Sequence, residues 1–115
     1  MKIEKFEDIK VWQKSKELTV MIYKMFNSCK DFGFREQIQR ASVSIMNNIA
    51  EGFERSGDKE LKRFLFISKG SCGEIRSMLY LALEFEYINK KQFEEIYNST
   101  LEISKMLSGF IKKLY

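Results

Sequence analysis

The 115-residue sequence contains no histidine and no proline, and these two absences narrow both its chemistry and its fold. Without histidine, the Glu-x-x-His pairs of di-iron bundles, the usual zinc sites and a histidine general base are all excluded. Without proline, and with only 6 glycines, the chain suits long uninterrupted helices better than sheets joined by tight turns. The composition therefore predicts an all-α protein and argues against a metalloenzyme.

Cysteines and long apolar runs are also scarce. The two cysteines, Cys29 and Cys72, lack metal-type spacing, and no signal peptide is recognisable, so we expect free thiols in a cytoplasmic protein. Cys72 falls on an apolar helical stripe, which indicates a core residue rather than a nucleophile. The longest stretch without a charge, 41–50, is far shorter than the roughly 20 residues of a membrane span. We expect no catalytic residue, no cofactor and no metal.

Charge of either sign is present, but the positive excess is modest. The formal net charge is +4, from 20 basic and 16 acidic residues. Residues 1–30 carry 7 Lys against 4 acids, and residues 89–115 carry 5 Lys against 3 acids, so the excess lies in the first and last segments. A balance of this size permits a polyanionic partner without requiring one.

Apolar residues recur at intervals of three and four, which predicts four helices at about 8–28, 34–54, 58–86 and 89–114. Asp8 and Asp58 are predicted N-caps, Asn89 with Gln92 has the form of a capping box, and Gly33 lies in the first connection. Such short connections place successive helices antiparallel. The chain is therefore predicted to be a single domain, 1–115, folded as an antiparallel up-down-up-down four-helix bundle in which the first and last helices are neighbours.

The third predicted helix should be the most buried. Its core stripe is broadened by a second row of side chains. Gly70 and Gly73 each cost about 1 kcal/mol relative to Ala inside a helix, so we expect another backbone to approach closely there. The second row consists of Ile67, Ser71, Met78, Leu81 and Phe85.

A polar stripe on the second predicted helix permits three interpretations. It is a solvated face with a surface pair between Glu51 and Arg55, which would contribute under about 0.5 kcal/mol. Alternatively, Arg40, Asn48, Glu51 and Glu74 satisfy one another in a partly buried network that sets the register of two helices. The third alternative is a ligand site. The sequence leaves these alternatives open.

Lysines are the candidates for a binding surface. Six of them, on the first and last helices, are predicted to merge into one basic face for RNA or DNA, while the alternative is that they are simply the solvated side of two amphipathic helices. The six are Lys10, Lys14, Lys24, Lys105, Lys112 and Lys113.

Several motifs resemble one bacterial family of four-helix bundles, first noticed in intervening sequences of large-subunit (23S) rRNA genes and also designated S23 ribosomal-protein-like. The resemblance covers nearly the whole chain. Met46-Asn47 stands where the family often has Pro-Ser, and Ser68-Lys69 where it often has Ala-x. The motifs are Asp8-x-x-Val11-Trp12-Gln13-Lys14, Phe32-Gly33-Phe34, Gln37-Ile38-x-Arg40-Ala41-Ser42-Val43-Ser44-Ile45, Asn48-Ile49-Ala50-Glu51-Gly52 and Gly70-Ser71-x-x-Glu74.

This resemblance implies a ring-like homo-oligomer, a pentamer, with no known catalytic activity. A more distant resemblance is to accessory proteins of diversity-generating retroelements, basic bundles that bind nucleic acid and a reverse transcriptase. We expect a nucleic-acid-binding adaptor or, alternatively, a scaffold ring for a protein partner, marked by exposed side chains such as Phe66, Met78 or Tyr80. The predicted packing or assembly positions are Arg40, Asn48, Glu51, Gly52, Gly70, Ser71 and Glu74.

Overall fold

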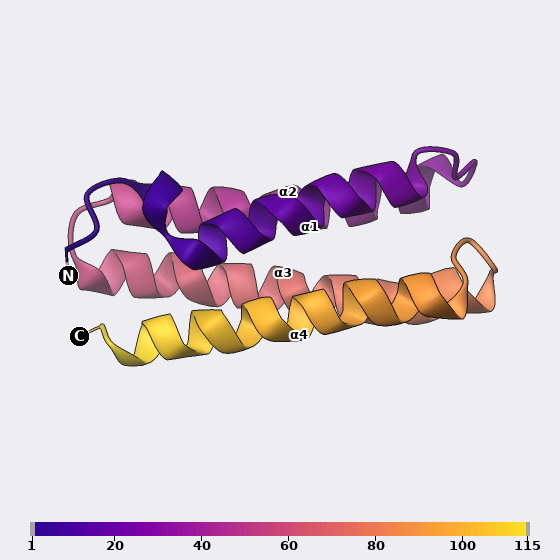
Figure 1. Ribbon diagram of the computed structural model, residues 1–115. Coiled ribbons are helices and arrows are strands. Elements are labelled where there is room, and N and C mark those ends of the chain that lie inside the picture. The colour runs from indigo at the N-terminus through magenta and orange to yellow at the C-terminus, as the bar shows by residue number, and fades with distance from the viewer. Residues whose placement is uncertain (1, 115) are drawn as a thin grey trace.

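The computed structural model describes residues 2–114, which form an antiparallel bundle of four α-helices (Figure 1). A short 3-10 helix, η1 (Phe6–Asp8), precedes α1 (Lys10–Phe26), α2 (Phe32–Glu54), α3 (Asp58–Glu84) and α4 (Lys90–Lys112). The bundle measures 43 × 21 × 20 Å, and α1 packs against both α2 and α4. The predicted all-α, up-down-up-down architecture is confirmed. None of the described helices combines the length and apolar character needed to cross a membrane.

The helix starts differ from those predicted. Asp8 belongs to η1, and Ile9 occupies the N-cap of α1 without a side-chain hydrogen bond. The N-cap of α3 is Gly57, whose φ of +90° favours glycine, so Asp58 is instead the first helical residue and complements the N-terminal dipole. The predicted capping box of α4 is confirmed, because Asn89 and Gln92 exchange side-chain and backbone hydrogen bonds of 2.8 and 2.9 Å.

Helix α2 begins two residues earlier than predicted. The backbone N–H of Phe34 donates to Oδ1 of Asp31 at 3.2 Å, so Asp31 is the N-cap. Gly33 therefore lies in the first turn of α2 and not in the connection.

The core runs the length of the bundle and draws on every helix. Helix α3 contributes the largest share of buried residues, as predicted, and its contact with α2 is the most extensive between any two helices. Large side chains with no exposed surface include Leu18, Ile22 and Phe26 of α1, Ile38, Ile45 and Ile49 of α2, Leu65, Ile75 and Leu79 of α3, and Ile96, Ile103 and Leu107 of α4.

Small polar residues of α2 and α3 fix the register of the central helix pair. The buried hydroxyl of Ser68 donates to the carbonyl oxygen of Ile45 at 2.9 Å, and Ser71 donates to Oγ of Ser44 at 3.0 Å. Each bond satisfies a polar group inside the bundle and is made at one register only. Serine therefore occupies these positions, where a plain amphipathic helix would carry leucine.

Helices α2 and α3 pack closely at Gly52. A Cβ at this position would lie 2.7 Å from Cβ of Phe64 and 3.2 Å from Cδ1 of Leu61. Gly70, in contrast, is exposed and a Cβ there would meet nothing within 4 Å, while at Gly73 it would meet only Nη2 of Arg76 at 3.8 Å. The prediction of a close backbone approach at Gly70 and Gly73 is wrong for the described chain.

One hydrogen bond ties the two connections at the same end of the bundle. The hydroxyl of Tyr87 donates to Oδ2 of Asp31 at 2.6 Å, and the Tyr87 ring packs edge-on against Phe34 at 5.2 Å between centroids. The Tyr87 hydrogen bond and that from Phe34 hold the pKa of Asp31 below its ordinary 3.8, and the same bond to Asp31 raises the pKa of Tyr87 to about 12.

Replacing Tyr87 by Phe is expected to remove a pH-dependent part of the stability. The Asp31 contribution is present above pH 3.8 and is lost as pH falls through the lowered pKa of the folded state. The Tyr87 contribution is present below its ordinary pKa of 10 and is lost as pH rises toward 12. Melting temperatures across the pH range should therefore differ most between the two proteins near neutrality, and a difference that does not change with pH would contradict this account.

Candidate functional surfaces

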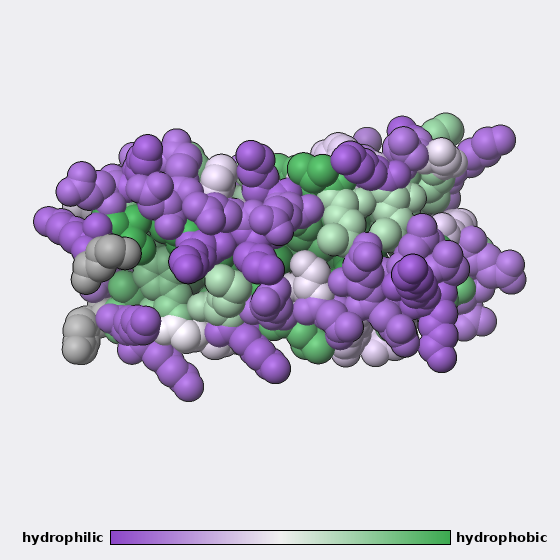
Figure 2. Space-filling model, in the orientation of Figure 1, coloured by the Kyte–Doolittle hydropathy of each residue, from purple (hydrophilic) through white to green (hydrophobic). Residues whose placement is uncertain are grey.

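The predicted basic face of α1 and α4 is only partly assembled. Nζ of Lys14 pairs with Oε1 of Glu102 at 3.1 Å across the two helices, on a half-exposed part of the surface. Lys10 and Lys113 line a shared groove of about 320 Å³ whose other walls are mainly apolar. Apolar surface is exposed along this seam between α1 and α4, with hydrophilic residues on both sides (Figure 2).

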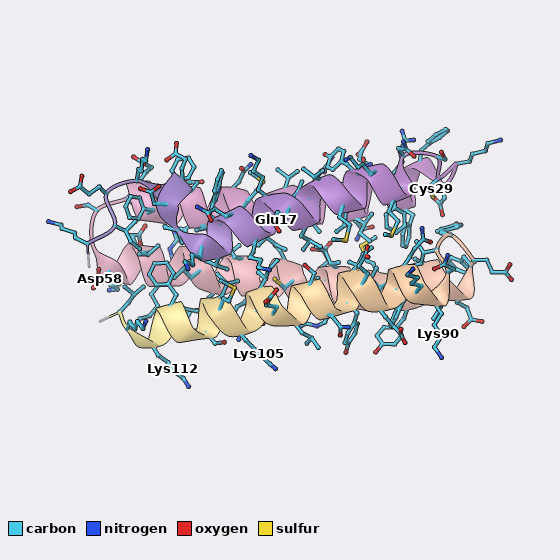
Figure 3. The ribbon with its side chains drawn as sticks, viewed as in Figure 1. Glu17, Cys29, Asp58, Lys90, Lys105 and Lys112 are labelled. Atoms are coloured by element: carbon cyan, nitrogen blue, oxygen red, sulfur yellow. The ribbon has the colours of Figure 1, made fainter. Side chains whose placement is uncertain are left out.

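The remaining lysines lie elsewhere. Lys105 and Lys112 point away from α1, on the outer side of α4 (Figure 3). Lys24 is 14 residues from Lys10, which places it about 21 Å away along α1. The six lysines therefore do not merge into one face, and that part of the prediction is wrong. The helical periodicity located each lysine on its own helix but could not give the rotation of α4 relative to α1.

The polar stripe of α2 is mostly solvated. Arg40 pairs with Glu36 at 2.9 Å and Glu51 with Arg55 at 2.8 Å, each within one turn of the same helix. Oε2 of Glu74 accepts a hydrogen bond from Gln37 at 3.3 Å. Asn48 is half-buried and donates to the carbonyl oxygen of Ser44 at 2.8 Å. The four residues Arg40, Asn48, Glu51 and Glu74 do not satisfy one another, so the network interpretation is wrong and the solvated one holds for the charged members.

The cysteines behave as the sequence predicts for structural thiols. Cys72 has no exposed surface, and burial raises the pKa of its thiol to about 11, so at neutral pH it is protonated and a poor nucleophile. Cys29 is half-buried in the α1–α2 connection, at the opposite end of the bundle from Lys112 (Figure 3). No group of three or more His, Cys, Asp or Glu side chains within residues 2–114 is placed to hold a metal ion.

The outer face of α3 carries an exposed apolar row that the sequence assigned to the core. Ile67, Leu81 and Phe85 are 41%, 49% and 53% exposed, whereas Ser71 and Met78 of the same predicted row are buried. Ile67 and Phe85 are separated by five helical turns and so point in the same direction, with Leu81 beside them and the open Gly70 between. We call Ile67, Gly70, Leu81 and Phe85 the α3 apolar stripe. Of the proposed scaffold markers, Phe66 and Tyr80 are exposed and Met78 is not.

A second row follows the other edge of the exposed α3 surface, beside α4. Its residues are spaced alternately by four and three positions, the spacing of one helical stripe. The sequence signal for this row is the seven-residue spacing of its basic positions, Lys62, Lys69 and Arg76. This basic–aromatic stripe consists of Lys62, Phe66, Lys69, Gly73, Arg76 and Tyr80.

Comparisons with known proteins agree with this architecture. Residues 7–109 match the family model described as 23S rRNA-intervening sequence protein. A solved structure from Bacteroides thetaiotaomicron, described as a protein with unknown function from the S23 ribosomal protein family, is 35% identical. Its TM-score is 0.83, with 89% of this chain and 98% of that chain covered. No curated protein matches the chain.

Proposed function

Because the chain belongs to the 23S rRNA-intervening sequence protein family, we propose that it is a non-catalytic, self-assembling bundle that binds RNA or DNA as an adaptor. The observation that carries the proposal is the availability of its lysines. Of the six lysines first singled out, Lys14 alone forms an ion pair among the residues that the structure describes. The other five can therefore approach phosphates without first breaking a pair. A cytoplasmic location is part of the proposal and is supported by the two free thiols.

Self-assembly is proposed through the α3 apolar stripe. Exposed apolar side chains that share one helical face are typical of protein interfaces, and the open Gly70 lets a partner helix approach closely, although exposed Glu74 lies between Ile67 and Leu81. A ring-like homo-oligomer, a pentamer by the family resemblance, would repeat a weak basic surface several times. Several weak contacts with one polyanion then add up to useful affinity.

The molar mass in solution, measured by light scattering with and without a short structured RNA, tests the proposal. We expect a homo-oligomer whose mass rises with RNA at low salt and returns to its starting value as salt increases, because phosphate contacts release counterions. An oligomer whose molar mass does not change when RNA is added at low salt would favour the scaffold alternative, in which the exposed α3 residues bind a protein partner. A monomer would contradict self-assembly.

A variant pair locates the interface in the same measurement. Ile67→Glu with Leu81→Glu is expected to reduce the molar mass to that of the monomer, since burying two unpaired carboxylates at an interface is costly. Val20→Glu is the matched control, because Val20 is similarly exposed but lies on α1. Circular dichroism should show an unchanged helix content in both. Loss of assembly in Val20→Glu alone would place the interface elsewhere.

A further inference from the structure

The basic–aromatic stripe is a continuous surface feature of α3. Lys62, Lys69 and Arg76 follow one another at seven-residue intervals, about 10.5 Å apart along the helix axis. Phe66 lies between the two lysines and is 55% exposed, and Tyr80 continues the row with 58% exposure. Three positive and two aromatic side chains therefore share one row of about 27 Å, the distance from Lys62 to Tyr80, with Gly73 between Lys69 and Arg76.

Helix α4 extends this surface sideways. Nζ of Lys69 donates to Oγ of Ser108 at 2.6 Å, which fixes the two helices against each other at this point. Lys105 and Lys112 lie three residues before and four residues after Ser108, and so flank it on the helix surface. Both point away from α1 (Figure 3). Four lysines from two helices thus gather around one contact.

No acidic residue lies in the segments of α3 and α4 that face each other around the contact between Lys69 and Ser108. The facing segments 61–73 of α3 and 103–114 of α4 run antiparallel past the contact between Lys69 and Ser108, and neither contains Asp or Glu. Glu74, the next acidic residue in α3, bonds to Gln37 on the α2 side. The positive potential of the stripe is therefore not cancelled locally, although the whole of residues 58–88 is charge-balanced.

Arg76 adds an unused donor. Its Nη1 is buried without a hydrogen-bond partner among the described residues, whereas buried guanidinium nitrogens are ordinarily paired. Nη2 of the same side chain lies 3.8 Å from the position of a Cβ at Gly73, so the glycine leaves the space beside the guanidinium open. The Arg76 side chain is only partly buried, so a small rotation would bring this unpaired, charged donor to a phosphate oxygen.

From these contacts we propose that the basic–aromatic stripe, with Lys105 and Lys112, binds single-stranded nucleic acid. The proposal rests on the proposed nucleic-acid function and deepens it by naming the strand type and the surface. The lysines and Arg76 hold the phosphates, and the exposed rings of Phe66 and Tyr80 stack on bases. Tyr80 is already supported edge-on by Phe93 at 5.2 Å, so its ring is held in place before a base arrives. A duplex hides its base faces and gains only the charge contacts.

The charge contacts are tested by two double variants with the same change in net charge. Lys62→Gln with Lys69→Gln is expected to weaken binding of fluorescently labelled oligouridylate at least tenfold and to lower the salt slope by about 1.4. Lys16→Gln with Lys30→Gln, two exposed lysines outside both candidate surfaces, should change the affinity less than threefold. Equal losses in both variants would overturn this surface while leaving the proposed function standing. Failure of the wild-type protein to bind any strand would overturn the proposed function itself.

Stacking is tested by moving the tryptophan. Trp12 is the sole tryptophan and lies on α1, so a Trp12→Phe, Phe66→Trp protein places the fluorophore in the stripe. Oligouridylate and oligothymidylate should both quench its emission, with any difference between them showing whether RNA or DNA is preferred, and a blunt duplex should quench it far less. Equal quenching by duplex and single strand, or none with bound single strand, would overturn the assignment.

Discussion

Phe26→Ala is expected to lower the free energy of unfolding by about 3–5 kcal/mol, the largest effect of any single change considered for this bundle. Phe26 is the last residue of α1, has no exposed surface and packs against the Phe34 ring at 6.0 Å between centroids. Its removal leaves a cavity where α1 and α2 meet, which rigid helices can fill only in part. The total free energy of unfolding of a domain of this size is about 5–15 kcal/mol, so this single change would remove much of its stability.

Urea unfolding followed by far-UV circular dichroism measures this change. Phe32→Ala is the matched control, because Phe32 is 65% exposed and its ring centroid lies 5.1 Å from the guanidinium of Arg35, a contact worth about 0.5–1 kcal/mol. All proteins should be compared at one chain concentration, since unfolding of an oligomer depends on it. Similar losses for Phe26→Ala and Phe32→Ala would contradict the account of the core.

Gly52→Val is expected to cost about 3 kcal/mol by forcing α2 and α3 apart. The new Cβ would lie 2.7 Å from Cβ of Phe64, an atom fixed to the backbone that no side-chain rotation can move away. Overpacking a core usually costs about 1–3 kcal/mol, and we therefore expect Gly52→Val to lie near the upper end of this range. The same urea experiment measures the loss.

Gly109→Ala separates this steric effect from the general cost of glycine in a helix. Gly109 lies in α4, is exposed, and a Cβ there would meet nothing within 4 Å. This change should raise the stability by up to about 1 kcal/mol, because Ala is the better helix former. If Gly52→Val were as well tolerated as Gly109→Ala, the close packing of α2 on α3 would not hold.

Local sequence signals predict features whose residues are close along the chain, but they do not show which side of a helix its neighbours cover. The capping box of Asn89 and Gln92 was found because both partners are three residues apart. The apolar stripe of Ile67, Leu81 and Phe85 was assigned to the core, because apolar periodicity marks a wide helical face without showing how much of it the neighbouring helices cover. An exposed patch and a buried one therefore look alike in sequence.

The sequence by itself determined that the chain folds as four antiparallel helices, because helical periodicity, scarce glycine and short connections act between residues that are neighbours along the chain. Only the tertiary structure decided that α3 packs closely on Gly52 of α2 while Gly70 faces open space, and that Lys69 reaches Ser108 across α3 and α4. Such contacts depend on how each helix is rotated and shifted against the next. That choice is made by the packing of whole side chains, which no local pattern records.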